Sequence, residues 1–157
     1  MQPKRYFDEL SIGELFVSQG RTITETDIVM WSSITSDWTP IHVDEEFAKS
    51  TVFGTRIPPG LMSQAISHGL LSRLDGPQCI ASIAFLKLTV HYLGVVRVGD
   101  TLRAELRIQD KRLAKKNRGV VVYDCRTINQ RDEAVQRSEW EILVSCRPSS
   151  ADDDHSG

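Results

Sequence analysis

The sequence of 157 residues predicts an α+β domain in which one long helix packs against an antiparallel sheet. From Leu61 to Leu70 apolar residues recur in pairs every four residues, which is typical of a buried helix face. Beyond residue 80 apolar and polar residues alternate, as they do along strands with one buried face. Because each pattern has an apolar side to cover, the simplest arrangement curls the sheet around the helix.

Length and composition fit one ordinary globular domain, which we place at residues 1–147. The net charge of -2 gives no reason to expect nucleic acid or a membrane surface as partner. No apolar run is long enough to cross a membrane, and the first residues lack the apolar core of a signal peptide, so we expect a cytoplasmic protein. Residues 148–157 contain three consecutive aspartates and are predicted to form a disordered acidic tail.

The first elements are short. A strand is expected between residues 6 and 23, after a turn at Gly13. Thr24 and Asp27 have the spacing of a capping box, which predicts a helix over about 25–35.

Pro40 is expected to exclude helix at its position, so residues 37–42 are predicted to be a loop that presents reactive side chains. A short helix capped by Asp44 should follow and end by Gly54. Two prolines then precede Gly60, where the long helix is expected to begin, and residues 75–77 should terminate it.

The second half predicts a sheet of four strands joined by short turns, which favours an antiparallel meander. The expected strands are 80–92, 100–112, 119–129 and 134–147.

Asp37, His42 and Gly60 are the candidate catalytic set. A carboxylate and an imidazole can divide proton transfers around one water molecule. The N–H group of a glycine that opens a helix can bind a developing oxyanion. Alone, Asp37 reads as a turn former and His42 as a structural histidine; together with Pro40 and Gly60 they favour an active site.

Other polar residues predict less. His68 is expected to be structural or to line the pocket. Lys115, Lys116 and Arg118 lie between two strands, where they could contact phosphates or, as we favour, be solvated hairpin charges. The three cysteines are widely separated and are expected to be buried reduced thiols, and the histidines lack metal-binding spacing, so we expect no metal.

The chain resembles the MaoC-type dehydratases and (R)-specific enoyl-CoA hydratases over most of residues 6–147. Their Asp-x-Asn-Pro-x-His-x-Asp pattern is matched by Asp37, Pro40, His42 and Asp44. Weaker matches are Phe53-Gly54 with Ile57 and Gly60, and the Val-Gly-Asp turn at residues 98–100. The resemblance implies the hot-dog fold, a long central helix wrapped by a curved antiparallel sheet.

The resemblance also implies a reaction. Asp37 and His42 would activate water and the Gly60 N–H would bind the thioester oxygen, which hydrates a trans-2-enoyl thioester to the (R)-3-hydroxyacyl form. The substrate would be carried on CoA or acyl-carrier protein, with no cofactor, and the protein would be a homodimer or a dimer-based oligomer.

Two positions depart from the family pattern. Thr39 stands where Asn is usual and Pro59 where His is usual, both beside the expected pocket. They leave open two alternatives: a non-catalytic or accessory subunit that binds acyl thioesters, and an acyl-CoA thioesterase.

Overall fold

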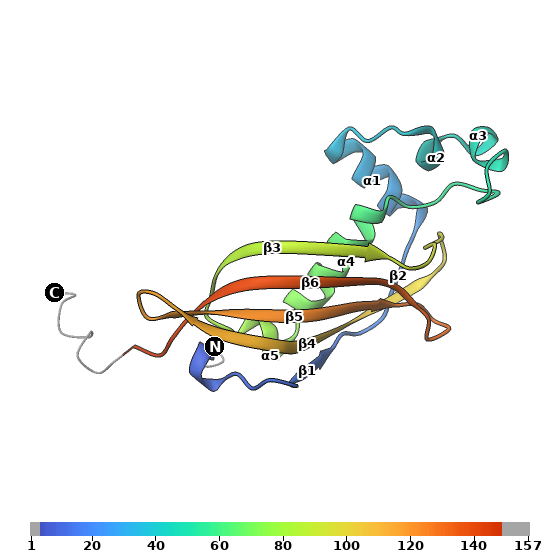
Figure 1. The fold of residues 1–157 in the computed structure, drawn as a ribbon. Coiled ribbons are helices and arrows are strands. Elements are labelled where there is room, and N and C mark those ends of the chain that lie inside the picture. The colour runs from blue at the N-terminus through green and yellow to red at the C-terminus, as the bar shows by residue number, and fades with distance from the viewer. Residues whose placement is uncertain (1–3, 149–157) are drawn as a thin grey trace.

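The computed structural model describes residues 4–148, in which α4 (Gly60–Ser72) lies against one face of an antiparallel sheet (Figure 1). The predicted α+β class is therefore confirmed. All of the predicted acidic tail except Pro148 lies outside the described residues.

The sheet has six strands, and its four long strands match the predicted ranges to within two residues at each end. The strands are β1 (Leu15–Val17), β2 (Arg21–Thr22), β3 (Ser82–Tyr92), β4 (Thr101–Ala114), β5 (Arg118–Ile128) and β6 (Ala134–Ser145). Their order is β1-β4-β5-β6-β3, and β2 also pairs with β4.

The predicted meander is correct for β4, β5 and β6 but wrong for β3, which pairs with β6 instead of β4. The chain after β3 explains the difference. The N–H groups of Leu93 and Gly94 both donate to the Val135 carbonyl, at 2.9 and 3.0 Å, so this segment stays beside β6. It then crosses the end of the sheet before β4 begins.

The helix α4 turns a different face to the sheet from the one predicted. Leu61 is 62% exposed and Ala65 is also exposed, although both belong to the apolar stripe. The buried residues of this helix are instead Met62, Ser63, Gln64, Ser67 and Leu71. This face is buried because the sheet offers it polar partners.

Two hydrogen bonds show this pairing between α4 and the sheet. The Ser67 and Thr127 hydroxyl oxygens lie 2.7 Å apart, and the Gln136 side-chain N–H donates to Gln64. A buried polar side chain is tolerated when it is hydrogen-bonded. A hydrophobic pattern alone therefore could not identify the buried face.

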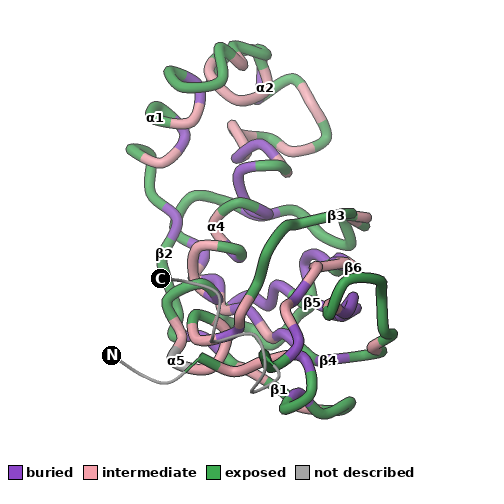
Figure 2. Tube along the Cα trace, turned by 90° about the vertical axis from the view of Figure 1, so that its left-hand side faces the viewer, coloured by how far each residue is buried: buried purple, intermediate pink, exposed green. Residues whose placement is uncertain are grey.

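The core consists of two clusters, and buried residues follow the inner face of the sheet and α4 (Figure 2). The larger cluster includes Leu71, Leu106, Tyr123 and Trp140. The smaller one, with Ile28 and Met62 among its members, joins α1 (Glu25–Thr35) to the sheet.

The remaining helices are short, and three of them form a lobe beyond one end of the sheet (Figure 1). The lobe comprises α1 (Glu25–Thr35), α2 (Pro40–Val43) and α3 (Glu45–Lys49); the other helical segments are a 3₁₀ turn (Phe7–Glu9) and α5 (Asp75–Gln78).

The lobe confirms two predicted helix caps. Asp27 accepts a hydrogen bond of 2.8 Å from the Thr24 N–H, which confirms the capping box. Asp44 accepts one of 3.0 Å from the Phe47 N–H and caps α3.

Proline was misread at two sites. Pro40 does not exclude helix; it is the first residue of α2, where its missing N–H costs nothing. Residues 75–77 likewise do more than terminate α4, because they form most of α5.

Gly54 is also not the end of α3, which stops earlier, at Lys49.

No helix in the described part of the chain is long and apolar enough to cross a membrane.

Cys125 and Cys146 are buried free thiols as predicted, whereas Cys79 is only half-buried. Burial raises the pKa of Cys125 to about 12, so this thiol stays protonated.

Candidate active site

The three candidate catalytic residues line one cavity of about 410 Å³. Asp37 and His42 come from the lobe, and Gly60 is the first residue of α4. The ends of β3 and β6 supply Tyr92 and Gln136 as the opposite wall. The fold thus brings Asp37 and Gly60, which are 23 positions apart in the sequence, to the same cavity.

His42 is held in a defined orientation. Its Nδ1 lies 2.7 Å from the carbonyl oxygen of Ile57, which can only accept a hydrogen bond. Nδ1 must therefore carry a proton, which leaves Nε2 of the neutral ring as an acceptor. A ring fixed in this tautomer can take a proton from a bound water molecule.

Asp37 is held by Thr39. The Thr39 hydroxyl donates to Asp37 Oδ1 at 2.6 Å, and the Thr39 N–H donates to the same oxygen at 3.3 Å. These two bonds, the hydroxyl first, hold the pKa of the Asp37 carboxyl below its usual value, with His42 adding to the effect. The carboxylate is therefore ionised at neutral pH and accepts hydrogen bonds only.

Two acceptors facing one cavity can bind the two hydrogens of a single water molecule. The Asp37 carboxylate and the His42 Nε2 are such acceptors, so the water oxygen would be left free to attack. Thr39 occupies the position of the usual Asn, and its hydroxyl directly contacts the carboxylate.

Gly60 offers a backbone donor on the other side of the cavity. In the first turn of a helix the N–H groups have no intrahelical acceptor, and the helix dipole favours negative charge there. A Cβ atom at this position would lie 2.6 Å from Cε1 of Tyr92, so any other residue here would have to displace the Tyr92 ring. The preceding Pro59 also lines the cavity, and its carbonyl accepts the Met62 N–H at 3.0 Å.

Sequence reasoning missed three polar residues of this cavity, namely Ser63, Tyr92 and Gln136. Ser63 and Gln136 are each 2% exposed, and within residues 4–148 neither Ser63 Oγ nor Gln136 Oε1 has a hydrogen-bond partner. Ser63 could have been found because it lies one turn after Gly60. Gln136 could not, because no local pattern pairs its strand with the start of α4.

The structure does not bring His68 to this cavity. It lies two turns further along α4 and lines a different cavity, with its ring centroid 5.4 Å from that of Trp140. The Lys115, Lys116 and Arg118 cluster lies in the turn between β4 and β5, at the end of the sheet away from the lobe (Figure 1). Within one chain these cations are remote from Asp37.

Comparison with known proteins identifies the family. The model of the MaoC-like domain matches residues 9–129, well over half of the chain. Over 104 residues the chain is 36% identical to an (R)-specific enoyl-CoA hydratase from Rhodospirillum rubrum, covering 66% of this chain and 69% of the relative. It is 32% identical over 106 residues to a 3-hydroxybutyryl-CoA dehydratase from Methylorubrum extorquens, covering 67% and 64%, so the match spans just under two thirds of the latter.

Solved structures agree with this assignment. A monoamine oxidase regulatory protein from Archaeoglobus superimposes with a TM-score of 0.89 at 33% identity, covering 94% of this chain and 98% of the other. An (R)-hydratase from Pseudomonas aeruginosa gives 0.73 at 29% identity, covering 90% and 86%. A double-hotdog protein from Mycobacterium tuberculosis gives 0.77 over 93% of this chain and 46% of its own, at 22% identity, which supports the fold alone. With its sheet, its long helix and the matched residues 9–129, the chain belongs to the MaoC-like domain family and has the hot-dog fold.

Proposed function

We propose that this protein interconverts trans-2-enoyl and (R)-3-hydroxyacyl thioesters. The observation that carries the proposal is the meeting of Asp37, His42 and the Gly60 N–H around one cavity. Relatives named as a hydratase and a dehydratase support the same reaction class. Hydration and dehydration are the two directions of one equilibrium, so both names fit one site.

In the proposed mechanism a water molecule donates its hydrogens to the Asp37 carboxylate and to His42 Nε2. One acceptor takes a proton while the water oxygen bonds to Cβ of the enoyl group. The electron pair of the double bond moves toward the thioester, and the Gly60 N–H stabilises the resulting enolate oxygen. A proton then returns to Cα, so the product has gained one water and the thioester is intact.

Two effects supply most of the acceleration. General acid–base catalysis typically contributes roughly 10²–10⁴-fold, and one oxyanion donor contributes about 10²–10³-fold. Thr39 supports the first effect because it keeps Asp37 ionised and oriented. Either Asp37 or His42 returns the proton to Cα. No cofactor takes part in it.

The test replaces each acid–base residue by one with a neutral amide side chain. Asp37→Asn and His42→Gln should each lower crotonyl-CoA hydration by at least about 10²-fold, since each removes a proton acceptor. The readout is the loss of the conjugated double bond, with circular dichroism to show that the fold is intact. Asp44→Asn is the matched control, because Asn also caps helices and Asp44 caps α3 outside the cavity.

Three outcomes separate the alternatives. Unreduced hydration in either cavity variant would sink the assignment. Release of free CoA in place of double-bond loss would identify a thioesterase. Binding of acyl-CoA without any turnover by the wild-type protein would identify an accessory subunit.

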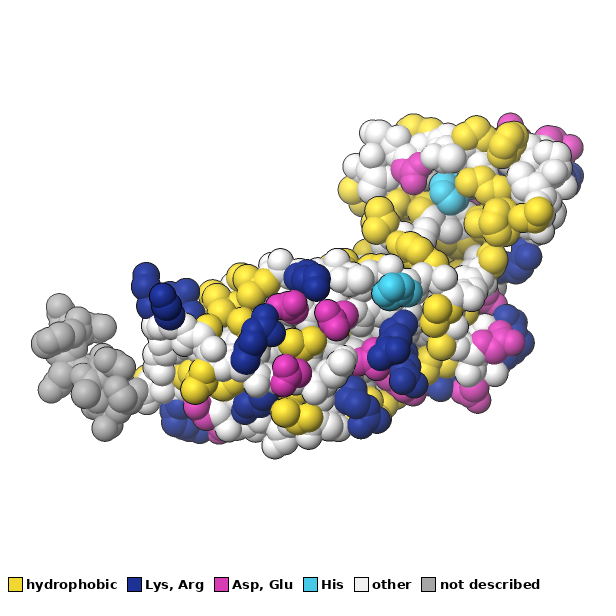
Figure 3. All heavy atoms as spheres, viewed as in Figure 1, with side chains coloured by type: hydrophobic (Ala, Val, Ile, Leu, Met, Phe, Trp, Pro, Cys, Tyr) yellow, Lys and Arg dark blue, Asp and Glu magenta, His cyan; other side chains and the backbone are white. Residues whose placement is uncertain are grey.

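We also infer that the working protein is a homodimer joined along β3. This strand is at one edge of the sheet, and its exposed apolar side chains include Phe85, Leu86 and Leu88. Hydrophobic side chains also gather on the lobe, while the visible face of the sheet is rich in charge (Figure 3). An unpaired apolar edge strand favours association, and a second copy of the same edge can pair with it. The proposed substrates are thioesters of CoA or of acyl-carrier protein, and the proposed location is the cytoplasm.

A further inference from the structure

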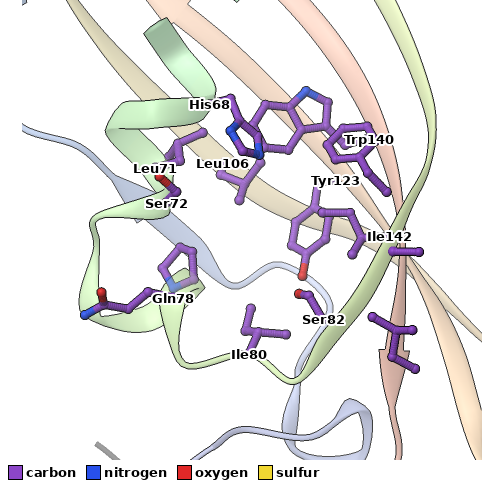
Figure 4. Close-up of a pocket in the computed structure, with 14 residues that line it drawn as sticks. His68, Leu71, Ser72, Gln78, Ile80, Ser82, Leu106, Tyr123, Trp140 and Ile142 are labelled. Atoms are coloured by element: carbon purple, nitrogen blue, oxygen red, sulfur yellow. The ribbon is translucent and has the colours of Figure 1, made fainter. Parts of the chain in front are cut away.

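Three cavities follow one another along α4. The candidate active site lies at Gly60, and Leu61 separates it from a second cavity of about 450 Å³. His68 and Phe85 line both the second cavity and a third of about 300 Å³. Figure 4 shows residues that line the third cavity. The shared residues make the three cavities neighbours. From Gly60 to Ser72 the helix advances about 18 Å, so the third cavity lies far from the candidate acid–base pair.

The second cavity is strongly apolar, as a hydrocarbon chain requires. Its wall includes Trp31, Leu61, Ala65, Phe85 and Leu88. An acyl chain that enters from the active site and follows α4 would cross this apolar stretch before it reaches the third cavity.

The third cavity contains the hydroxyl group of a tyrosine. Tyr123 is 1% exposed, and it lines this cavity. Figure 4 shows the Tyr123 and Ser82 hydroxyl oxygens directed toward the same part of the cavity. Burial raises the pKa of Tyr123, so the hydroxyl keeps its proton as a donor. A hydroxyl that faces a cavity can donate a hydrogen bond to a ligand bound there.

The ligand group should be neutral. The charged groups that act on Tyr123 are Glu14 and Arg5, which neutralise each other in an ion pair of 2.6 Å. None of the described residues that line the third cavity is Lys or Arg, and the imidazole of His68 packs against the Trp140 ring. A carboxylate would therefore meet no permanently charged cation there, whereas a hydroxyl or keto oxygen would accept the Tyr123 hydrogen bond.

We propose that the third cavity binds a neutral oxygen at the distal end of the acyl chain, so the protein prefers oxygenated acyl thioesters to plain ones of equal length. Tyr123 is the specificity residue and Ser82 a second contact. This inference rests on the proposed function, because it names the acyl group carried by that substrate.

Isothermal titration with saturated acyl-CoA pairs tests the inference without catalysis. Each pair consists of a plain acyl-CoA and its terminal hydroxy derivative, over a series of chain lengths. At the length that reaches Tyr123 the hydroxy form should bind about tenfold more tightly, as one net hydrogen bond allows. Tyr123→Phe should reduce that ratio to about one, while the matched control Tyr6→Phe, which removes the hydroxyl of a half-buried tyrosine outside the three cavities, should keep it.

Equal dissociation constants for both members of every pair with the wild-type protein would overturn the inference, whether or not the variants fold. A preference that survives in Tyr123→Phe would overturn the role of Tyr123. Hydration of crotonyl-CoA is measured separately, so activity without tail preference would refute this inference alone. Tail preference without activity would refute the proposed function alone.

Discussion

Thr39 makes two hydrogen bonds to a single oxygen of Asp37, and this pairing explains how the site keeps its carboxylate in place without the usual Asn. A threonine has one hydroxyl donor, whereas an Asn side chain has two N–H donors. Thr39 thus gives Asp37 one donor from its side chain and one from its backbone. Compared with Asn, it lacks the second N–H of the side-chain amide.

Thr39→Val removes the hydroxyl group that donates to Asp37. Without the hydroxyl, the pKa of Asp37 should rise toward its ordinary value of about 3.9. In the folded wild-type protein this pKa is lowered, so the stabilisation is present above the unfolded pKa and disappears as the pH falls through the folded one. Carboxyl-carbon NMR titration measures the shift. Thr39→Ser keeps the hydroxyl and should keep the low pKa; a similarly low pKa in Thr39→Val would contradict the explanation.

The buried hydroxyl group of Ser63 has no hydrogen-bond partner within residues 4–148. Ser63→Ala should raise the free energy of unfolding by about 1 kcal/mol, because it removes an unsatisfied polar group. Ser67→Ala should lower it by a similar amount, because it breaks the bond to Thr127. Urea denaturation measures both. A loss of stability in Ser63→Ala would mean that this hydroxyl is satisfied in solution.

At the scale of elements, the start of α4 and the end of β3 are fitted closely together. The Tyr92 ring lies where a side chain on residue 60 would lie. This contact aligns the helix start with the sheet and places the Gly60 N–H at the cavity wall. The alignment depends on a glycine, although the backbone there is not in a left-handed conformation.

Gly60→Ala tests this contact. The added methyl must displace the Tyr92 ring, since its Cβ would lie 2.6 Å from Cε1, so we expect a loss of about 1–3 kcal/mol in stability and a fall in hydration. In a Tyr92→Ala background the same change should cost much less, because the ring is gone. A double-mutant cycle by thermal denaturation measures the coupling. Additive effects would show that the two residues act independently.

The sequence predicted those elements whose signal is local. Alternation predicted β4 and β6, and the β-branched run at residues 120–122 predicted β5, which is buried on both faces. The face of α4 was predicted wrongly because its partners on the sheet, Thr127 and Gln136, are polar and distant in the sequence. The helix at Pro40 was missed because proline both breaks helices and begins them.

The candidate site was predictable only in part. Asp37, His42 and Gly60 were found because two of them lie in one short motif and the third opens a helix. Ser63, Tyr92 and Gln136 became visible only in three dimensions, since the pairing of β3 with β6 brings two of them to the cavity. The separation of His68 from Asp37 likewise follows from the direction of α4 and not from any local pattern.

At the scale of the whole molecule, the chain leaves many large apolar side chains exposed. Several of them lie on α1, α4 and β3, and β3 forms one edge of the sheet. A second copy that pairs along β3 would cover them and close the cavities that follow α4.

Leu86→Glu should therefore shift the protein from dimer to monomer, because it places a charge on the apolar edge strand, where Leu86 is 51% exposed. Light scattering coupled to size-exclusion chromatography measures the mass. Leu113→Glu is the control, since Leu113 is 74% exposed near the far turn of β4 and should not affect association. A monomeric wild-type protein would refute the dimer.

The five residues from Arg56 to Gly60 link the lobe to the start of α4. Arg56 forms ion pairs with Glu25 on α1 and Glu45 on α3, and the Ile57 carbonyl binds His42. Gly60 follows after two stiff prolines. This short segment therefore sets the span from the His42 imidazole to the Gly60 backbone donor, so a few consecutive residues fix the acid–base side of the cavity to its oxyanion side.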